Sequence, residues 1–179
     1  DELKKMNPEW KSLGHAIVPL AIMNKIGCNF NTHDSKSVYE FFIYYLRAKQ
    51  LNDDAHDWEE DYSADRYNYV IEKNKKMFPE DINSFSAKKI FWEEIAPLEL
   101  SKIRKYCKCA ISSIEKCEKI ETLDFYYLLI SPIAKSTGKA FLERKSAIDF
   151  INNFHPKVDI NRHFEAFGKK AKVPPKESS

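Results

Sequence analysis

The segment from Ser37 to Leu51, SVYEFFIYYLRAKQL, most constrains how this chain can fold. Wound as a helix, it carries apolar side chains on most of its faces, and a helix of that kind is buried inside a domain. The helical pattern begins near Asp34 or Ser35 and continues to about Tyr62. We therefore predict a long central helix with other helices packed around it.

The rest of the chain also shows helical periodicity, punctuated by capping and breaking residues. The further predicted helices cover 8–27, a weaker segment 65–78, 85–96, 97–120, 123–130 and 133–154. Ser86 and Thr122 are candidate N-caps. Pro19 is expected to kink the first helix, and Pro132 to interrupt the last helical region. No segment shows the sustained alternation that is typical of strands, so we predict an all-α helical bundle.

Length and composition predict one helical domain over residues 1–168 and a disordered polar tail over 169–179. The chain has 43% apolar and 31% charged residues, as soluble proteins do. Its net charge of +2 gives no reason to expect nucleic-acid binding. No apolar run has the roughly 20 residues of a membrane span, although peripheral membrane contact stays open. The four cysteines match no zinc spacing and suit a reducing compartment, so a cytoplasmic location is expected.

An acidic stretch follows the apolar segment directly. Six of the nine residues from Asp53 to Asp61 are carboxylates, with no Lys or Arg among them. At 100° per residue, Asp54, Asp57 and Asp61 fall in one narrow stripe below Gln50, with Asp53 beside it. Like charges at this spacing destabilise a helix, and its C-terminal turns favour cations over anions. Divalent cations would resolve the conflict, because Mg²⁺ prefers carboxylate oxygens and substrate phosphates as ligands.

The motif resembles two elements of the all-α isoprenoid synthases. Gln50, Asp53, Asp54 and Asp57 match, position by position, the Q-x-x-D-D-x-x-D of the trans-prenyl diphosphate synthases. The order of helices and loops from Pro8 to Tyr69 is also similar to the segment that leads into that motif.

The second match is to the squalene and phytoene synthases, whose element ends in D-x-x-E-D. Asp57, Glu60 and Asp61 match it, and Arg66 and Tyr67 fall near the Arg and Tyr that follow in that branch. The chain therefore resembles both branches of the family.

The resemblance implies a Mg²⁺-dependent transferase or lyase that acts on a prenyl diphosphate inside a helical bundle. It implies metal ligands at Asp53, Asp54, Asp57 and Asp61, and substrate contacts from Gln50, Arg66 and Lys11. Metal ions would neutralise and orient the leaving diphosphate, and an apolar cavity would protect the carbocation.

Two features depart from the family pattern. No first aspartate-rich motif precedes Asp53, and the sequence YSADRYNYV stands where a Gly-Lys pair often follows the second motif. We therefore expect the C-terminal portion of a larger domain, with the first motif upstream. A homodimer also stays open.

Two other functions stay open. One is a non-catalytic helical protein that keeps the fold in order to bind a partner. The other is an HD-type metal phosphohydrolase, because His56 and Asp57 form an HD pair with His33 upstream.

Overall fold

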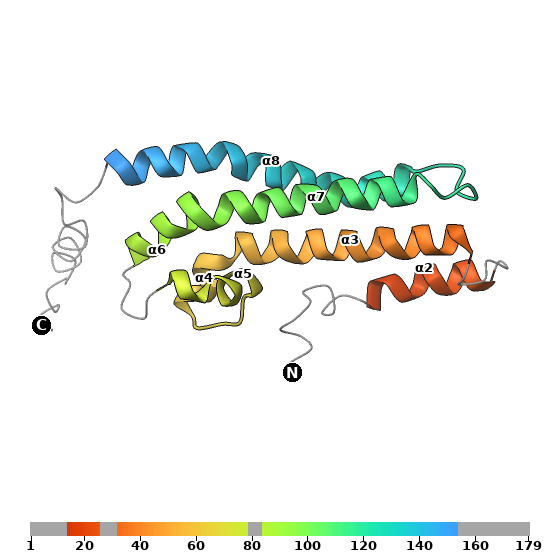
Figure 1. Ribbon diagram of the computed structural model, residues 1–179, viewed down its shortest axis with the longest axis horizontal. Coiled ribbons are helices and arrows are strands. Elements are labelled where there is room, and N and C mark those ends of the chain that lie inside the picture. The colour runs from red at the N-terminus through yellow and green to blue at the C-terminus, as the bar shows by residue number, and fades with distance from the viewer. Residues whose placement is uncertain (1–13, 26–31, 79–83, 154–179) are drawn as a thin grey trace, which may run out of the picture.

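The computed structural model describes residues 14–25, 32–78 and 84–153, and this part of the chain is helical without strands (Figure 1). The prediction of an all-α helical bundle is confirmed. The elements are α2 (Gly14–Lys25), α3 (His33–His56), α4 (Trp58–Ser63), α5 (Tyr69–Lys73), a 3-10 turn η2 (Lys75–Met77), α6 (Ser84–Ile90), a π-helical segment η3 (Phe91–Ile95), α7 (Ala96–Ile114) and α8 (Asp124–Asn153). Among these helices, none combines the length and apolarity needed to span a bilayer.

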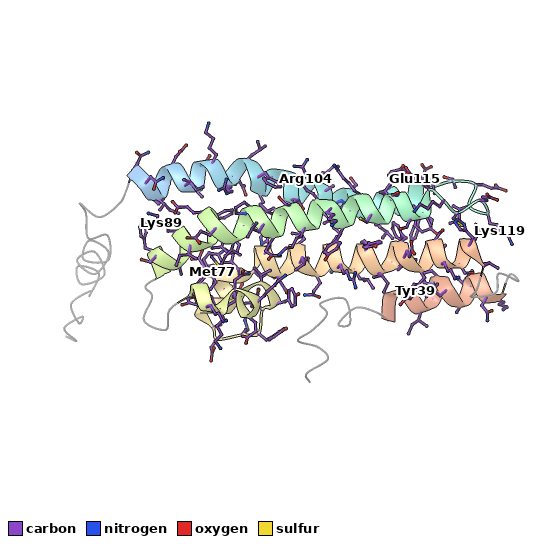
Figure 2. All side chains as sticks on the ribbon, in the orientation of Figure 1. Tyr39, Met77, Lys89, Arg104, Glu115 and Lys119 are labelled. Atoms are coloured by element: carbon purple, nitrogen blue, oxygen red, sulfur yellow. The ribbon has the colours of Figure 1, made fainter. Side chains whose placement is uncertain are left out.

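The central helix is α3, as predicted. Thr32 caps it, because its Oγ1 accepts a hydrogen bond from the backbone N–H of Ser35 at 3.3 Å. Helix α3 lies alongside α7 over most of its length and also contacts α2 and α8 (Figure 1). Side chains of α3 and α7 fill the space between the two helices (Figure 2). Phe41 is fully buried there, with the ring of Tyr126 from α8 edge-on to it at 4.8 Å.

Residues 84–114 form one continuous helical run, so the predicted boundary before Pro97 is wrong. Proline has no N–H to donate to the carbonyl groups of the preceding turn. The helix widens there instead, and the N–H of Ala96 bonds to the carbonyl of Phe91, five residues back. The run begins at Ser84, so Ser86 lies in its first turn and is not the N-cap.

Arg144 of α8 compensates for the missing donor at Pro97. Its Nε donates to the carbonyl of Trp92 at 2.8 Å, and its Nη2 donates to the carbonyl of Glu93 at 3.3 Å. A residue with a backbone N–H at position 97 would donate to the carbonyl of Trp92 in a π-helix and to the carbonyl of Glu93 in an α-helix. The guanidinium therefore fastens α8 to the widened turn.

Helix α8 passes through Pro132, so the predicted interruption is also wrong. Pro132 is exposed, whereas Ile130 and Ile133 on either side of it are buried. Burial of these side chains keeps the helix together past the proline. Thr122 stands before the helix as predicted, and its Oγ1 accepts from the N–H of Asp124 at 3.4 Å.

Several predictions concern residues outside the described ranges. They include the start of the first helix at Pro8, its end near Gly27, Lys11 and the tail 169–179.

Candidate functional site

The acidic stretch does not lie on a single helix. Helix α3 ends at His56, and α4 begins at Trp58. Asp57 stands between them with φ −90° and ψ 5°, so the prediction of an unbroken helix to about Tyr62 is wrong. Trp58 is buried and stacks on Phe91 at 4.2 Å. Burial of the Trp58 ring favours the break between α3 and α4, and so does the repulsion among neighbouring carboxylates on one helix.

Asp54 is the buried member of the acidic stretch, at 6% exposure. Its Oδ1 accepts from Gln50 Nε2 at 2.8 Å, and its Oδ2 accepts from the backbone N–H of Tyr69 at 3.2 Å. A buried carboxylate is tolerated when its oxygen atoms have donors such as these. Gln50 thus orients a carboxylate of the acidic stretch, and its predicted contact with substrate stays a prediction.

Asn68 connects the acidic stretch to helix α5. Its Nδ2 donates to the carbonyl of Asp54 at 2.7 Å and to Asp61 Oδ2 at 2.9 Å. Its Oδ1 caps α5 by accepting from the N–H groups of Val70 at 3.0 Å and Ile71 at 3.2 Å. This buried asparagine was missed in the sequence, although asparagine just before a helical segment is a recognisable N-cap signal.

Basic side chains reach the other acidic residues. Lys49 Nζ lies 2.8 Å from Asp53 Oδ2, and this hydrogen bond raises the pKa of Lys49. Arg66 Nε lies 3.0 Å from Asp61 Oδ1, and its Nη2 pairs with Glu60. The Lys49–Asp53 and Arg66–Glu60 pairs are exposed to water and stabilise the fold only slightly, whereas the side chain of Asp61 is only 18% exposed.

The remaining two acidic residues, Asp57 and Glu59, also have basic side chains beside them. Lys88 from α6 pairs with Glu59 at 2.7 Å. His56 Nδ1 lies 3.5 Å from Asp57 Oδ1, and both side chains are exposed. The local lack of Lys and Arg is therefore compensated from Lys49, Arg66 and Lys88, outside the acidic run.

This arrangement does not fit the predicted Mg²⁺ site. Both carboxylate oxygens of Asp54 accept hydrogen bonds, and both of Asp61 lie against Arg66 or Asn68. Within the described residues, no three His, Cys, Asp or Glu side chains gather as a metal site would require. Mg²⁺ binding by Asp53, Asp54, Asp57 and Asp61 stays a prediction, as does the HD-type reading of His56 and Asp57.

An apolar groove lies along the middle of α3, and Lys49, the partner of Asp53, is one of its lining residues. It has a volume of about 230 Å³, and it is lined by Pro19 of α2, by Phe42, Tyr45, Leu46 and Lys49 of α3, and by Phe125 and Leu129 of α8. We call it the α2–α8 groove. Helix α2 is apolar in most positions, and its main packing partner in the described part of the chain is α3.

Exposed apolar side chains continue beyond this groove on both of its walls. On α2, Ile17, Val18 and Ile22 are 63%, 62% and 57% exposed. On α8, Phe125 and Leu128 are exposed near its first turns. A helix that is apolar all round is normally buried on all sides. The exposed side chains of α2 are therefore an apolar surface whose contact with water is unfavourable.

Comparison with known proteins identifies no relative. No family model, no curated protein and no solved structure matches this chain.

Proposed function

We propose that this protein binds an amphipathic helix of a partner protein in the α2–α8 groove and has no catalytic role there. The observation that carries the proposal is the exposure of Val18 and Ile22 on a helix whose main packing partner in the described part of the chain is α3. This is the non-catalytic, partner-binding alternative among the functions that the sequence leaves open.

The shape of the groove favours a helical occupant. Its walls are α2 and α8, and its floor is the apolar face of α3 around Phe42 and Leu46. A helix laid between two others over a third is the packing found in helical bundles. Helix-in-groove recognition depends on apolar anchors at i, i+3 or i+4 and i+7. A helix presenting such anchors would cover Val18 and Ile22, which lie within about 100° of Pro19 around α2.

The free energy available from this burial is sufficient for specific binding. Fully burying one Ile, Leu or Phe side chain stabilises by about 1.5–3 kcal/mol. Val18, Ile22, Phe125 and Leu128 are more than half exposed. Covering them would therefore contribute several kcal/mol, on the order of 4–6, before the costs of association.

Site-specific crosslinking tests the proposal. A photoreactive phenylalanine analogue at position 18 and, separately, at position 128 should capture the same protein in cells. The control position is Ala134, which is exposed and lies on another face of α8. A synthetic peptide of the captured helix should then bind the purified chain, and Ile22→Lys should weaken it at least tenfold while Ala134→Lys should not.

Other outcomes would contradict the proposal. Crosslinks to a second copy of this chain would assign the groove to a dimer interface, and crosslinks to lipid would assign it to a membrane surface. Equal binding of the peptide to wild type and to Ile22→Lys would remove the groove from the interaction altogether.

A second proposal follows from the family resemblance: a Mg²⁺-dependent enzyme with an isoprenoid-synthase-like fold that acts on prenyl diphosphates. Its specific support is that Asp53 and Asp57 of the matched motif remain partly exposed, whereas Asp54, whose oxygen atoms accept hydrogen bonds, would not be an open ligand. Calorimetric titration with Mg²⁺ and inorganic diphosphate tests it. Asp57→Ala should lower the affinity, whereas Glu59→Ala, which removes only the pair with Lys88, should not. Unchanged affinity in Asp57→Ala would reject the metal hypothesis.

A further inference from the structure

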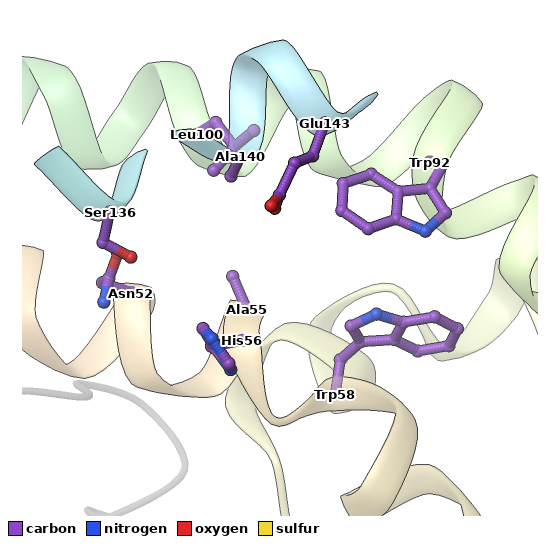
Figure 3. A pocket seen from close by; sticks show the side chains of 9 residues that line it. All are labelled: Asn52, Ala55, His56, Trp58, Trp92, Leu100, Ser136, Ala140 and Glu143. Atoms are coloured by element: carbon purple, nitrogen blue, oxygen red, sulfur yellow. The ribbon is translucent and has the colours of Figure 1, made fainter. Parts of the chain in front are cut away.

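A separate cavity lies where the end of α3 meets α4, η3, α7 and α8. Its volume is about 180 Å³, and Figure 3 shows the side chains that line it. Ala55, Leu100 and Ala140 give it apolar walls. The α2–α8 groove shares no lining residue with it, so what binds here is a separate question from the proposed function.

Two tryptophan rings face the cavity from opposite sides (Figure 3). Trp58 is 4% exposed, and its ring is held by parallel stacking on Phe91 at 4.2 Å. Trp92 is half-buried, and its ring stands edge-on to Phe91 at 5.4 Å. Phe91 therefore fixes both indoles, one on each of two packed helical segments.

A single acidic side chain enters the space beside these rings. Glu143 of α8 lines the cavity and points toward the space between Trp92 and Ala55 (Figure 3). The lining residues include no Lys or Arg. Glu143 forms an ion pair with Lys139, whose Nζ lies 3.3 Å from Glu143 Oε1. The side chain of Lys139 is mostly exposed.

We propose that the cavity between Trp58 and Trp92 binds a quaternary or methylated ammonium group. Aromatic faces attract such cations through the ring quadrupole, and Trp does so best. A quaternary ammonium has no N–H groups that need acceptors, and its methyl groups suit the alanine and leucine walls. Glu143 supplies the opposite charge at the mouth.

The size of the cavity agrees with this class of ligand. A cavity of roughly 150 Å³ accommodates benzene, and the volume here is about 180 Å³. That space suits a trimethylammonium group and excludes a long prenyl chain. The group has two possible sources, a free choline-like molecule or a trimethylated lysine side chain of another protein.

Tryptophan fluorescence and calorimetry on the full chain test the proposal. Choline and 3,3-dimethylbutan-1-ol have the same shape, but the alcohol carries carbon in place of the charged nitrogen. Choline should bind at least tenfold more tightly than the alcohol. Equal affinities would show an unspecific apolar cavity and overturn the proposal.

Variants then test the two recognition elements. Glu143→Gln and Trp92→Leu should each weaken choline binding at least tenfold. Glu94→Gln, an exposed neighbour that does not line the cavity, should leave it unchanged. Lys139→Met removes the competing cation and should strengthen binding by up to about fivefold. Glu143 and Lys139 are exposed, so these variants keep the fold, and unchanged affinity in Glu143→Gln overturns the assigned role.

A third titration separates the two sources. A peptide containing trimethyl-lysine should be compared with choline and with the same peptide unmethylated. Preference for either trimethylated ligand supports the site and identifies its source. Absence of binding for both at about 10 mM, a concentration far above that of any specific site, overturns the proposal.

Discussion

Asn68 shows how a single residue can organise a charged segment. Its amide nitrogen bonds to the acidic stretch at Asp54 and Asp61, and its oxygen caps α5. It is 1% exposed, so water cannot replace these partners. The asparagine therefore orders the chain on both sides of the loop that carries Arg66.

We expect Asn68→Ala to lower the free energy of unfolding by about 3 kcal/mol. Loss of an N-cap costs about 0.5–2 kcal/mol, and leaving buried groups without donors adds about 1–3 kcal/mol. Urea denaturation measures the change. The control is Asn74→Ala, which removes one hydrogen bond to the carbonyl of Val70 and should cost about 1 kcal/mol. Equal losses in the two variants would contradict the role given to Asn68.

Glu99 is a second residue whose burial depends on a specific neighbour. Its side chain is 2% exposed. Oε1 accepts from Lys102 Nζ at 2.6 Å, while Oε2 has no hydrogen-bond partner among the described residues. Beside it, burial and the neighbouring Lys102 lower the pKa of Lys73. Lys102 is therefore the cation on which the buried carboxylate depends.

We expect Lys102→Met to destabilise the protein by about 3 kcal/mol, because removing one partner leaves a buried charge uncompensated. Lys105→Met, on the exposed side of the same helix, should change stability by less than about 0.5 kcal/mol. Thermal unfolding followed by circular dichroism compares the two. If Lys102→Met is as stable as Lys105→Met, then Lys73 or water replaces the lost partner.

At the scale of elements, local sequence signals predicted where helices exist better than where they end. The start of α3 follows from its cap and its apolar faces, both of which are local properties. The break at Asp57 depends on burial of Trp58 against Phe91 from a distant helix. The same holds at Pro97 and Pro132, where packing outweighs a proline that alone would end a helix. Such long-range contacts produce no periodic pattern in the sequence, so they could not be predicted from it.

The candidate site shows the same division. The acidic run and the Gln50–Asp54 spacing are visible in the sequence, and their contact follows from helical geometry. The partners Lys88, Asn68 and the N–H of Tyr69 reach the run only through folding. A pattern of like charges was therefore interpretable as a metal site, because the donors that satisfy it lie elsewhere in the chain.

The pair of Arg144 and Pro97 gives a prediction for elements. Arg144→Met should destabilise by about 2 kcal/mol, because hydrogen bonds from a charged donor are worth about 1.5–3 kcal/mol. Pro97→Ala restores a backbone N–H, so it should recover part of that loss in the Arg144→Met background and gain less in the wild type. A double-mutant cycle from urea denaturation measures this coupling. Additive effects would show that Arg144 does not serve the carbonyl groups that Pro97 leaves free.

At the scale of the whole molecule, the buried core lies largely in the interface between α3 and α7, which we call the α3–α7 seam. Cys107 of α7 lies in this buried core, whereas Cys109, two residues on, is partly exposed. Burial raises the pKa of the Cys107 thiol to about 11, against an ordinary value of 9.0. Because the thiolate is the reactive form, Cys107 should react only when the helices separate.

We therefore expect a thiol reagent at pH 8 to label Cys109 rapidly in the folded protein and Cys107 only at the rate of global unfolding. A raised thiol pKa stabilises the fold fully below pH 9, and this contribution decreases as the pH rises from 9 toward 11. The difference between the labelling rates of Cys109 and Cys107 should become smaller as the pH rises from 9 to about 11. Mass spectrometry of the two sites across pH and urea measures both effects. Rapid labelling of Cys107 without urea would mean that the α3–α7 seam opens locally, and that the bundle does not unfold as one unit.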